Sequence, residues 1–125
     1  MEKILITPRE VFRIGEEEAC RFLRKNRCKI LDRNYRTRAG ELDIIARQNK
    51  NILFVEVKTR TSSAYAQPWE AVGYRKRKNI KAAARAYVQE KAIRGFEFRF
   101  DVISIVLDHE LKPAIEWIRN AFGES

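Results

Sequence analysis

The chain has 125 residues, with 26 lysines and arginines against 17 aspartates and glutamates, giving a formal net charge of +9. This length suits one domain with a real core and is too short for two. The positive charge favours a polyanion as partner. No apolar run is long enough to span a membrane and no signal-peptide pattern opens the chain, so we expect no membrane partner.

Two cysteines, Cys20 and Cys28, fit no zinc or redox spacing. We expect them to be buried, reduced side chains, which is typical of a cytoplasmic protein. His109 is the only histidine, so catalysis by a Ser-His pair or a multi-histidine metal site has little support.

The first predicted element is a helix. Thr7-Pro8-Arg9-Glu10 has the pattern of a capping box with proline at the first helical position, and the helix should run to about Asn26. Gly15 within it indicates close packing against a sheet. Glu16 lies on the inner stripe, where it is either a third carboxylate reaching the following hairpin or a solvated edge residue. The residues expected to be buried are Val11, Phe12, Ala19, Phe22 and Leu23.

A first strand is expected over residues 28–36, followed by a basic run to Arg38. Arg33, Arg36 and Arg38 are therefore candidates for gripping a nucleic-acid strand.

Residues 39–60 predict a hairpin of two alternating strands around the polar turn Gln48-Asn49-Lys50-Asn51. A turn centred on Asn49-Lys50 places Asp43 opposite Glu56 and Glu41 opposite Lys58. Directly opposed residues share a sheet face, with Cβ atoms roughly 4.5–5.5 Å apart. Two like charges at that distance repel, and Mg²⁺ or Mn²⁺ held by both carboxylates removes the repulsion. Two acids and a lysine at one point form the minimal set for metal-assisted phosphodiester hydrolysis.

The two faces of this hairpin differ in character. One face is predicted to be continuously apolar; it carries Leu42, Ile44, Ala46, Leu53, Val55 and Val57. The other carries the charged side chains and Arg60, with Ile45 and Phe54 among them, which indicates partial burial of the carboxylates. Two alternatives stay open: an ordinary half-exposed hairpin with a charged wet face, and a buried ion-pair lattice without metal.

The second half of the chain predicts a polar loop over residues 59–67, a helical region from Pro68 and a helix from Lys78 to about Lys91. A long strand should follow over residues 96–107, whereas 114–121 fits either a short strand or a helical turn. Within the loop, Tyr65 and Trp69 are candidates for stacking on bases, although core anchoring suits Trp69 better. The element order predicts a mixed β-sheet with helices packed on it, an α/β fold.

The second helix begins with the basic run Arg75-Lys76-Arg77-Lys78, and Arg77, Lys81 and Arg85 continue as a stripe at four-residue spacing. A helix start with a cationic stripe suits a phosphate backbone. The alternative is a solvated helix face, but no acidic residue between positions 71 and 88 is present to form salt bridges along the helix.

The motifs GEEEACRFL, GELDIIA, FVEVKTR, RFDV and NAF together resemble the YraN family of small proteins, over residues 14–122. Their centre is similar to the Asp…Glu-x-Lys signature of the restriction-endonuclease-like PD-(D/E)xK superfamily, and archaeal Holliday junction resolvases are closest in layout. The resemblance implies a three-layer fold with a mixed β-sheet flanked by helices. The first half-motif, Gly40-Glu41-Leu42-Asp43, has no proline, and Ala66 stands where relatives commonly have glycine.

The resemblance further implies Asp43 and Glu56 as metal ligands, Lys58 as catalytic lysine, Glu16 as an additional acidic catalytic residue and Lys76 as a family lysine. The residues expected to contact nucleic acid are Arg36, Arg38, Arg60, Lys76, Arg77, Lys81 and Arg85. The leading hypothesis is a Mg²⁺- or Mn²⁺-dependent endonuclease on DNA, with branched and junction DNA as candidate substrates. The alternatives are a non-catalytic nucleic-acid-binding module and an accessory subunit of a DNA-processing complex. Cutting both strands of a symmetric substrate favours a homodimer, with a monomer as the other option.

Overall fold

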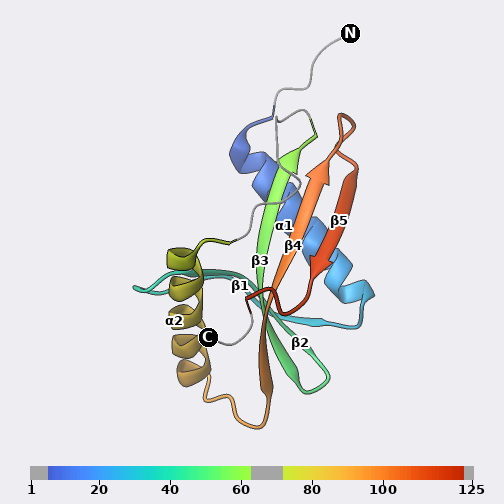
Figure 1. Cartoon of the computed structure of the whole chain (residues 1–125). Helices are drawn as coiled ribbons and strands as arrows, with labels where there is room; N and C mark the ends of the chain where they lie inside the picture. Colours follow the sequence, from blue (N-terminus) through green and yellow to red (C-terminus); the bar gives the residue numbers. More distant parts are fainter. Residues whose placement is uncertain (1–5, 63–71, 123–125) are drawn as a thin grey trace.

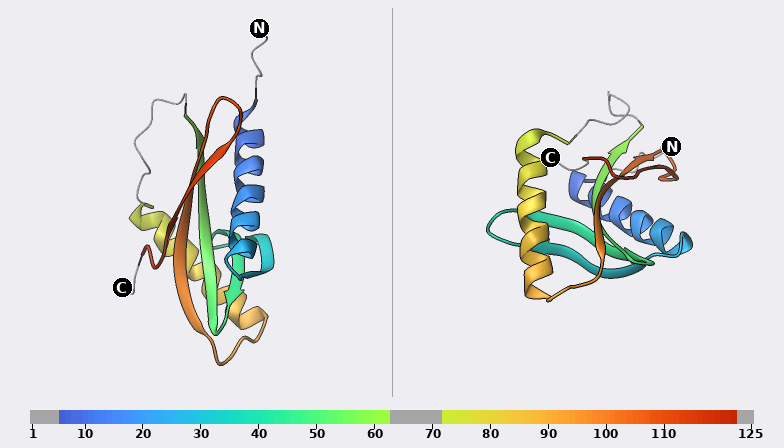
Figure 2. Two further views of the ribbon diagram at one scale, coloured as in Figure 1. Left: turned by 90° about the vertical axis from the view of Figure 1, so that its right-hand side faces the viewer. Right: turned by 60° about the horizontal axis from the view of Figure 1, so that its bottom comes forward.

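The computed structural model describes residues 6–62 and 72–122. Within these ranges the elements follow in the order α1 (Pro8–Lys25), β1 (Lys29–Arg36), β2 (Glu41–Gln48), β3 (Asn51–Thr61), α2 (Tyr74–Glu90), β4 (Glu97–Leu107) and β5 (Pro113–Ile118). The strands form one sheet in sequence order (Figure 1). The two helices lie on opposite sides of the strands (Figure 2). The predicted class, a three-layer α/β fold with a mixed sheet flanked by helices, is confirmed.

The sheet is mixed because the chain crosses over only once. Strands β1, β2 and β3 pair antiparallel as a meander, and β4 and β5 also pair antiparallel. Strands β3 and β4 run parallel, and the connection between them contains α2. A parallel pair requires such a crossover, so α2 is placed over the face of the sheet opposite to α1.

Helix α1 begins as its sequence predicts. The Thr7 side chain accepts a hydrogen bond from the Glu10 amide and caps the helix, with proline in the first turn. The helix ends at Lys25, next to the predicted boundary. Of the side chains expected inside, Phe12 is 39% exposed, so its predicted burial is wrong; it lies toward the solvent edge of the apolar stripe.

The register of the β2–β3 hairpin follows the predicted turn. Gln48 pairs with Asn51, and the ladder continues to Ile44 opposite Val55. Asn49 has φ of 56°, a left-handed conformation that asparagine adopts more readily than most residues. The turn sequence therefore sets which residues of the two strands oppose each other.

The predicted apolar face of this hairpin is wrong at one position. Ile44 and Val55 pack on the α1 side of the sheet, but Leu42 packs with the core on the α2 side. On the neighbouring strand β1, Asn34 has φ of 51° between the residues paired with Ile44 and Leu42. This left-handed residue interrupts the alternation of the pleat, which the pattern of β2 alone does not reveal.

Three segments differ from the expected boundaries. Strand β3 runs to Thr61, so residues 59–61 belong to a strand and not to a loop, and they pair with β4. Helix α2 begins at Tyr74, earlier than Lys78. Residues 113–118, which fitted two structures, form β5. The proposed starting point Pro68 and the stacking candidates Tyr65 and Trp69 lie outside the described residues.

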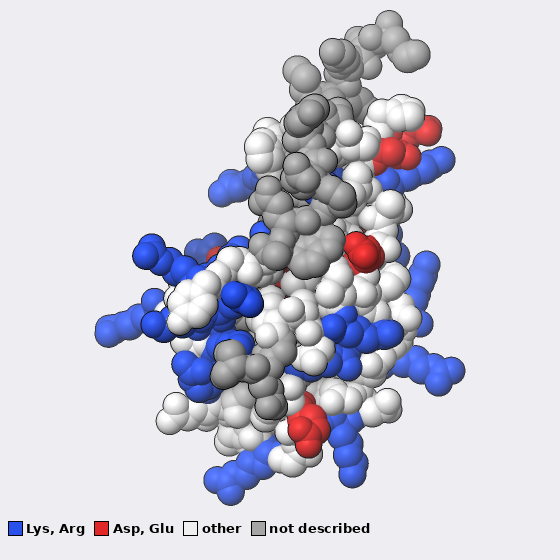
Figure 3. Space-filling view, viewed as in Figure 1, with Lys and Arg blue, Asp and Glu red and all other residues white. Residues whose placement is uncertain are grey.

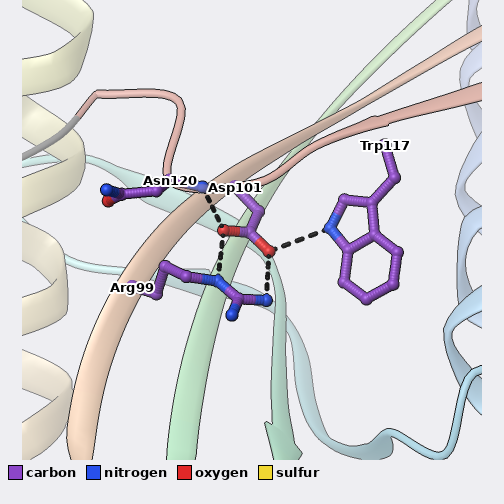
Figure 4. A network of polar contacts seen from close by, with 4 residues as sticks. All are labelled: Arg99, Asp101, Trp117 and Asn120. Atoms are coloured by element: carbon purple, nitrogen blue, oxygen red, sulfur yellow. Dashed lines mark hydrogen bonds and ion pairs between the residues drawn. The ribbon is translucent and has the colours of Figure 1, made fainter.

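The carboxy-terminal strand is tied to β4 through Asp101, which is fully buried (Figure 4). Both oxygens of Asp101 accept bonds from the Arg99 guanidinium, at 2.9 and 3.0 Å. Oδ2 also accepts from the Trp117 indole and Oδ1 from the Asn120 amide, each at 2.9 Å. A buried carboxylate is tolerated when it is paired and fully hydrogen-bonded. This network therefore fixes β5 and the segment after it.

Both cysteines are buried free thiols, and burial raises the pKa of each. This confirms them as inert interior side chains. Within the described residues no helix is long and apolar enough to cross a membrane.

Gly15 is where α1 crosses β3 most closely, as its place in the helix predicted. A Cβ built on Gly15 would clash with the side chain of Thr59, above all with its hydroxyl oxygen. We predict that Gly15→Ala lowers the free energy of unfolding by about 1–3 kcal/mol, the usual cost of overpacking. Urea denaturation measures it. Gly73→Ala is the control, because a Cβ there meets nothing within 4 Å. Equal stability of Gly15→Ala and the unchanged protein would contradict the close crossing.

Candidate functional site

Asp43 and Glu56 lie in one pocket on the α2 side of the sheet. The pocket has a volume of about 420 Å³ and is closed on its other side by Arg75, Lys76 and Asn79 of α2. Asp43 is 8% exposed and Glu56 6% exposed. The juxtaposition predicted from the hairpin register is therefore present, with both carboxylates buried.

Local backbone structure brings these side chains together. The β2–β3 ladder ends at Ile44 and Val55, and one residue further on Oδ2 of Asp43 accepts a hydrogen bond from the Val57 amide at 2.8 Å. The Val57 amide is thus bonded to a side chain at the point where the backbone ladder would otherwise continue. Gly40, just before β2, approaches α2 so closely that a Cβ there would lie 3.0 Å from the Asn79 carbonyl oxygen. The missing side chain lets the hairpin and the helix form two walls of one pocket.

The electrostatics of the pocket are unfavourable for two ionised carboxylates. Burial first, then the charge of Glu56 and a hydrogen bond between the two carboxyl groups, together raise the pKa of Asp43 to about 8. The Val57 amide and Lys76 act in the opposite direction. Asp43 is therefore protonated at neutral pH when no cation is bound.

Lys76 is the basic side chain in direct contact with the carboxylates. Its Nζ lies 3.2 Å from Oε1 of Glu56, and its own side chain is 54% exposed. Sequence reasoning placed Lys76 among nucleic-acid contacts through a family likeness but did not predict this ion pair. The start of α2 relative to the hairpin decides it, and no local pattern in the sequence encodes that placement.

Lys58 lies on the same face of β3 as Glu56, two residues further along, a distance of about 6.6 Å along a strand. It is half-buried and does not line the carboxylate pocket. Within the described ranges, no ion pair shorter than 4 Å involves Lys58. The predicted pairing of Lys58 with Glu41 is wrong, because the ladder ends before it and Glu41 instead lies 3.6 Å from Arg36.

Glu16 of α1 is buried and does not line the pocket either. Its Oε1 accepts hydrogen bonds from the Arg33 Nε at 3.1 Å and the Asn34 amide at 2.9 Å. Asn34 lies on β1 beside Asp43, so Glu16 approaches the site from the α1 side of the sheet. The catalytic role of Glu16 stays a prediction. In the structure, its carboxylate forms an ion pair with Arg33.

The remaining predicted basic residues do not line the pocket. Arg38 and Arg85 are exposed, while Arg60, Arg77 and Lys81 are half-buried. Lys and Arg side chains gather over α2 at the left of Figure 3, where few acidic side chains are visible. Among the described residues, α2 has no acidic side chain in its first turn, and its amino-terminal residue Gly73 offers no side-chain cap. The start of a helix attracts anions through its first amides and its dipole.

The donor set at the pocket fits a hard divalent cation. Mg²⁺ prefers oxygen ligands and commonly takes one or two carboxylates, completing its shell with water and phosphate oxygens. In residues 6–62 and 72–122, no cluster of three or more His, Cys, Asp or Glu side chains could hold a metal. The structure thus offers two carboxylates, Asp43 and Glu56, and not a closed cage of protein ligands.

Residues 15–105 match the family described as "Uncharacterised protein family UPF0102", also known as YraN. A UPF0102 protein of Solibacter usitatus is 43% identical over 112 residues, covering 88% of this chain and 83% of the relative. One of Clostridium acetobutylicum is 44% identical over 86% of this chain and 89% of its own length. One of Syntrophomonas wolfei is 46% identical over 91% and 98%.

The fold and the pocket define a small α/β protein with two buried carboxyl groups. The chain belongs to the UPF0102 family.

The raised pKa of Asp43 predicts a specific pH dependence of stability in EDTA. The unfolded carboxyl group ionises near its ordinary value of 3.8, whereas the folded one keeps its proton to about pH 8. Between these values the unfolded state binds fewer protons, so stability falls as pH rises from about 4 to about 8. Asp43→Asn removes this fall. The free energy of unfolding of the variant should therefore rise steadily, relative to that of the unchanged protein, from about pH 4 to about pH 8. Chemical denaturation at each pH measures it.

Asp108→Asn is a control of opposite sign. Hydrogen bonds from the Lys112 and Glu110 amides lower the pKa of Asp108. Its contribution to stability is complete above the ordinary carboxyl value, so the difference between Asp108→Asn and the unchanged protein should stay constant from pH 4 to 8. Parallel stability curves for Asp43→Asn and the unchanged protein over this range would contradict the buried, protonated Asp43.

Proposed function

We propose that this protein is a divalent-metal-dependent endonuclease of the restriction-endonuclease-like PD-(D/E)xK type, acting on DNA. The observation that carries the proposal is the buried pair Asp43 and Glu56, joined in one pocket beneath the basic start of α2. Two carboxylates that repel each other have a clear use when a divalent cation lies between them. The similarity in layout to archaeal Holliday junction resolvases makes branched and junction DNA the first substrates to test.

The protein's own groups divide the work. Asp43 and Glu56 would hold Mg²⁺ or Mn²⁺, which when bound lowers the pKa of water and polarises a phosphate. The Val57 amide keeps the Asp43 carboxylate oriented. Lys58, on the same face of β3, is placed to position the attacking water or to offset charge that develops on the phosphate. Lys76, which contacts Glu56, would be placed to contact a DNA phosphate.

The start of α2 supplies the phosphate-binding part of the site. Its uncapped amides, together with Arg75 and Lys76 in the pocket wall, present positive charge next to the carboxylates. Helix amino termini attract phosphate through these amides and through the helix dipole. The scissile phosphate therefore lies between the hairpin and the first turn of α2.

One observation favours a second candidate function. The ion pair between Lys76 and Glu56 partly neutralises the pocket without any metal. A non-catalytic nucleic-acid-binding module, or an accessory subunit of a DNA-processing complex, would retain such a pair as a structural contact. Cleavage assays separate this candidate from the endonuclease.

We predict metal-dependent cleavage that requires the pocket. Linear, flapped and four-way-junction DNA are incubated with Mg²⁺, Mn²⁺ or EDTA, and products are resolved on denaturing gels. Glu56→Gln and Lys58→Ala should each lower the cleavage rate about a hundredfold or more, because each removes a group that acts on developing charge. Glu110→Gln, in an exposed turn, is the control. Cleavage in EDTA, or full activity in Glu56→Gln, would contradict the endonuclease.

DNA affinity should depend on the α2 stripe and not on the opposite helix. Replacing Arg77, Lys81 and Arg85 with alanine should reduce the salt dependence of binding by at most about three units of slope, since each phosphate contact contributes about 0.9. Fluorescence anisotropy in EDTA at several salt concentrations measures the slope. Replacing Arg9, Arg13 and Arg24 removes the same charge from exposed positions on α1. A larger reduction of the salt slope in the α1 variant than in the α2 variant would show that DNA binds the α1 side of the sheet.

A further inference from the structure

A second, larger hollow lies beside the carboxylate pocket on the same face of the sheet. Its volume is about 850 Å³, within the usual range for sites that enclose a small molecule. The second half of α2 forms one wall with Lys81, Arg85 and Val88, and β3 and β4 form the floor with Phe54, Phe98 and Phe100. Lys81 and Arg85 belong to the predicted DNA-binding stripe of α2, whereas the aromatic floor has no role in the endonuclease site described above.

The floor is a run of stacked aromatic rings. The ring of Phe54 is stacked with Phe98 and Phe100 at centroid distances of 6.1 and 5.4 Å and interplanar angles of 25° and 27°. Phe54 is buried beneath them, but Phe98 is 43% exposed. The exposed ring of Phe98 continues the stack of Phe54 toward solvent within this hollow. Its flat geometry suits a planar ligand that continues the stack.

The charges around the hollow suit an anionic ligand. Nζ of Lys81 lies 6.0 Å from the centre of the Phe100 ring, and Arg85 is exposed at the rim. Arg99 also lines the hollow, but its charge is matched by Asp101 (Figure 4). Glu97 is the acidic residue of this lining. Aromatic faces combined with Lys and Arg are the means by which proteins bind single-stranded nucleic acid, through base stacking and phosphate contact.

The hollow adjoins the carboxylate pocket along both β3 and α2. Phe54 lies two residues from Glu56 on the same strand face, a distance of about 6.6 Å. Lys76 and Lys81 are separated by about 7.5 Å along the helix axis. One strand of nucleic acid lying along α2 therefore reaches both places.

We propose that this hollow, the aromatic groove, holds an unpaired base of a DNA strand, which stacks on Phe98 while its phosphates contact Lys81 and Arg85. The inference rests on the proposed function for the nature of the polymer, and it adds that the substrate has an unpaired base beside the cleaved bond. A second copy of the chain fits the groove less well, because each copy carries a net charge of +9 and would add like charge to a basic rim.

The test compares two single-stranded oligonucleotides of equal length, one with bases and one made only of abasic units, by fluorescence anisotropy in EDTA. The unchanged protein should bind the oligonucleotide with bases about tenfold more tightly, the order expected for one stacked base. Phe98→Leu keeps an apolar side chain but removes the ring, so it should lose most of this tenfold preference and bind the abasic chain unchanged. Phe98→Ala should act in the same direction.

Phe12→Leu is the matched control, because Phe12 is exposed to a similar extent, 39%, on α1. It should retain the full preference. Circular dichroism establishes that each variant is folded. Equal loss of affinity for both oligonucleotides in Phe98→Leu, or no loss for either, would overturn the proposal. Sedimentation that shows a dimer converted to a monomer by Phe98→Leu would also overturn it, because a second copy would then fill the groove.

These experiments distinguish failure of the aromatic groove from failure of the proposed endonuclease. A base preference that depends on Phe98, without metal-dependent cleavage, supports the groove and removes the endonuclease. Cleavage that depends on Glu56, without any effect of Phe98 on the base preference, supports the endonuclease and removes the groove.

Discussion

Two buried carboxyl groups held side by side are the arrangement on which the rest of this structure depends. Asp43 and Glu56 belong to neighbouring strands, yet no backbone ladder bond joins those strands at this point, because the Val57 amide is bonded to the Asp43 side chain. The strands diverge, and α2 closes the resulting space with Lys76. Repulsion and burial keep a proton on Asp43 near neutral pH. An arrangement that opposes stability in this way is typical of a functional site.

Much of this site could be predicted from the sequence, because it depends on local rules. The turn around Asn49 sets the hairpin register, and the register places Asp43 beside Glu56. The capping pattern at Thr7 and the glycine at position 15 likewise predicted where α1 begins and where it crosses the sheet. Each of these features is encoded within a few residues of the place where it acts.

The features that sequence reasoning missed depend on distant parts of the chain. Leu42 packs on the α2 side together with its partner on β1, Tyr35, which follows the left-handed residue Asn34. The ion pair of Lys76 with Glu56 depends on how the crossover helix α2 packs against the sheet. The buried Asp101 is satisfied by Trp117 and by the Asn120 amide, both from the carboxy-terminal segment. A pattern within one segment cannot encode these pairings.

The two faces of the sheet carry different sets of side chains. On the α1 side, the buried Glu16 forms an ion pair with the half-buried Arg33, and the apolar core fixes the helix to the sheet. On the α2 side, carboxylates, cations and stacked aromatic rings lie in adjacent hollows. The α2 side also has an apolar core of its own, so both faces contribute to stability. Under the proposed function, the α2 side would in addition accept an anionic polymer, and a divalent cation in the acidic pocket would favour the approach of a phosphate.

The occupancy of the pocket by a divalent cation is the central claim, and titration with Mn²⁺ followed by electron paramagnetic resonance tests it most directly. The signal of free Mn²⁺ falls as the ion binds, so the number of sites per chain is read from the titration. The account predicts one site per chain that is lost in Glu56→Gln and kept in Glu110→Gln. No binding by the unchanged protein at millimolar Mn²⁺, or equal binding by Glu56→Gln, would contradict it.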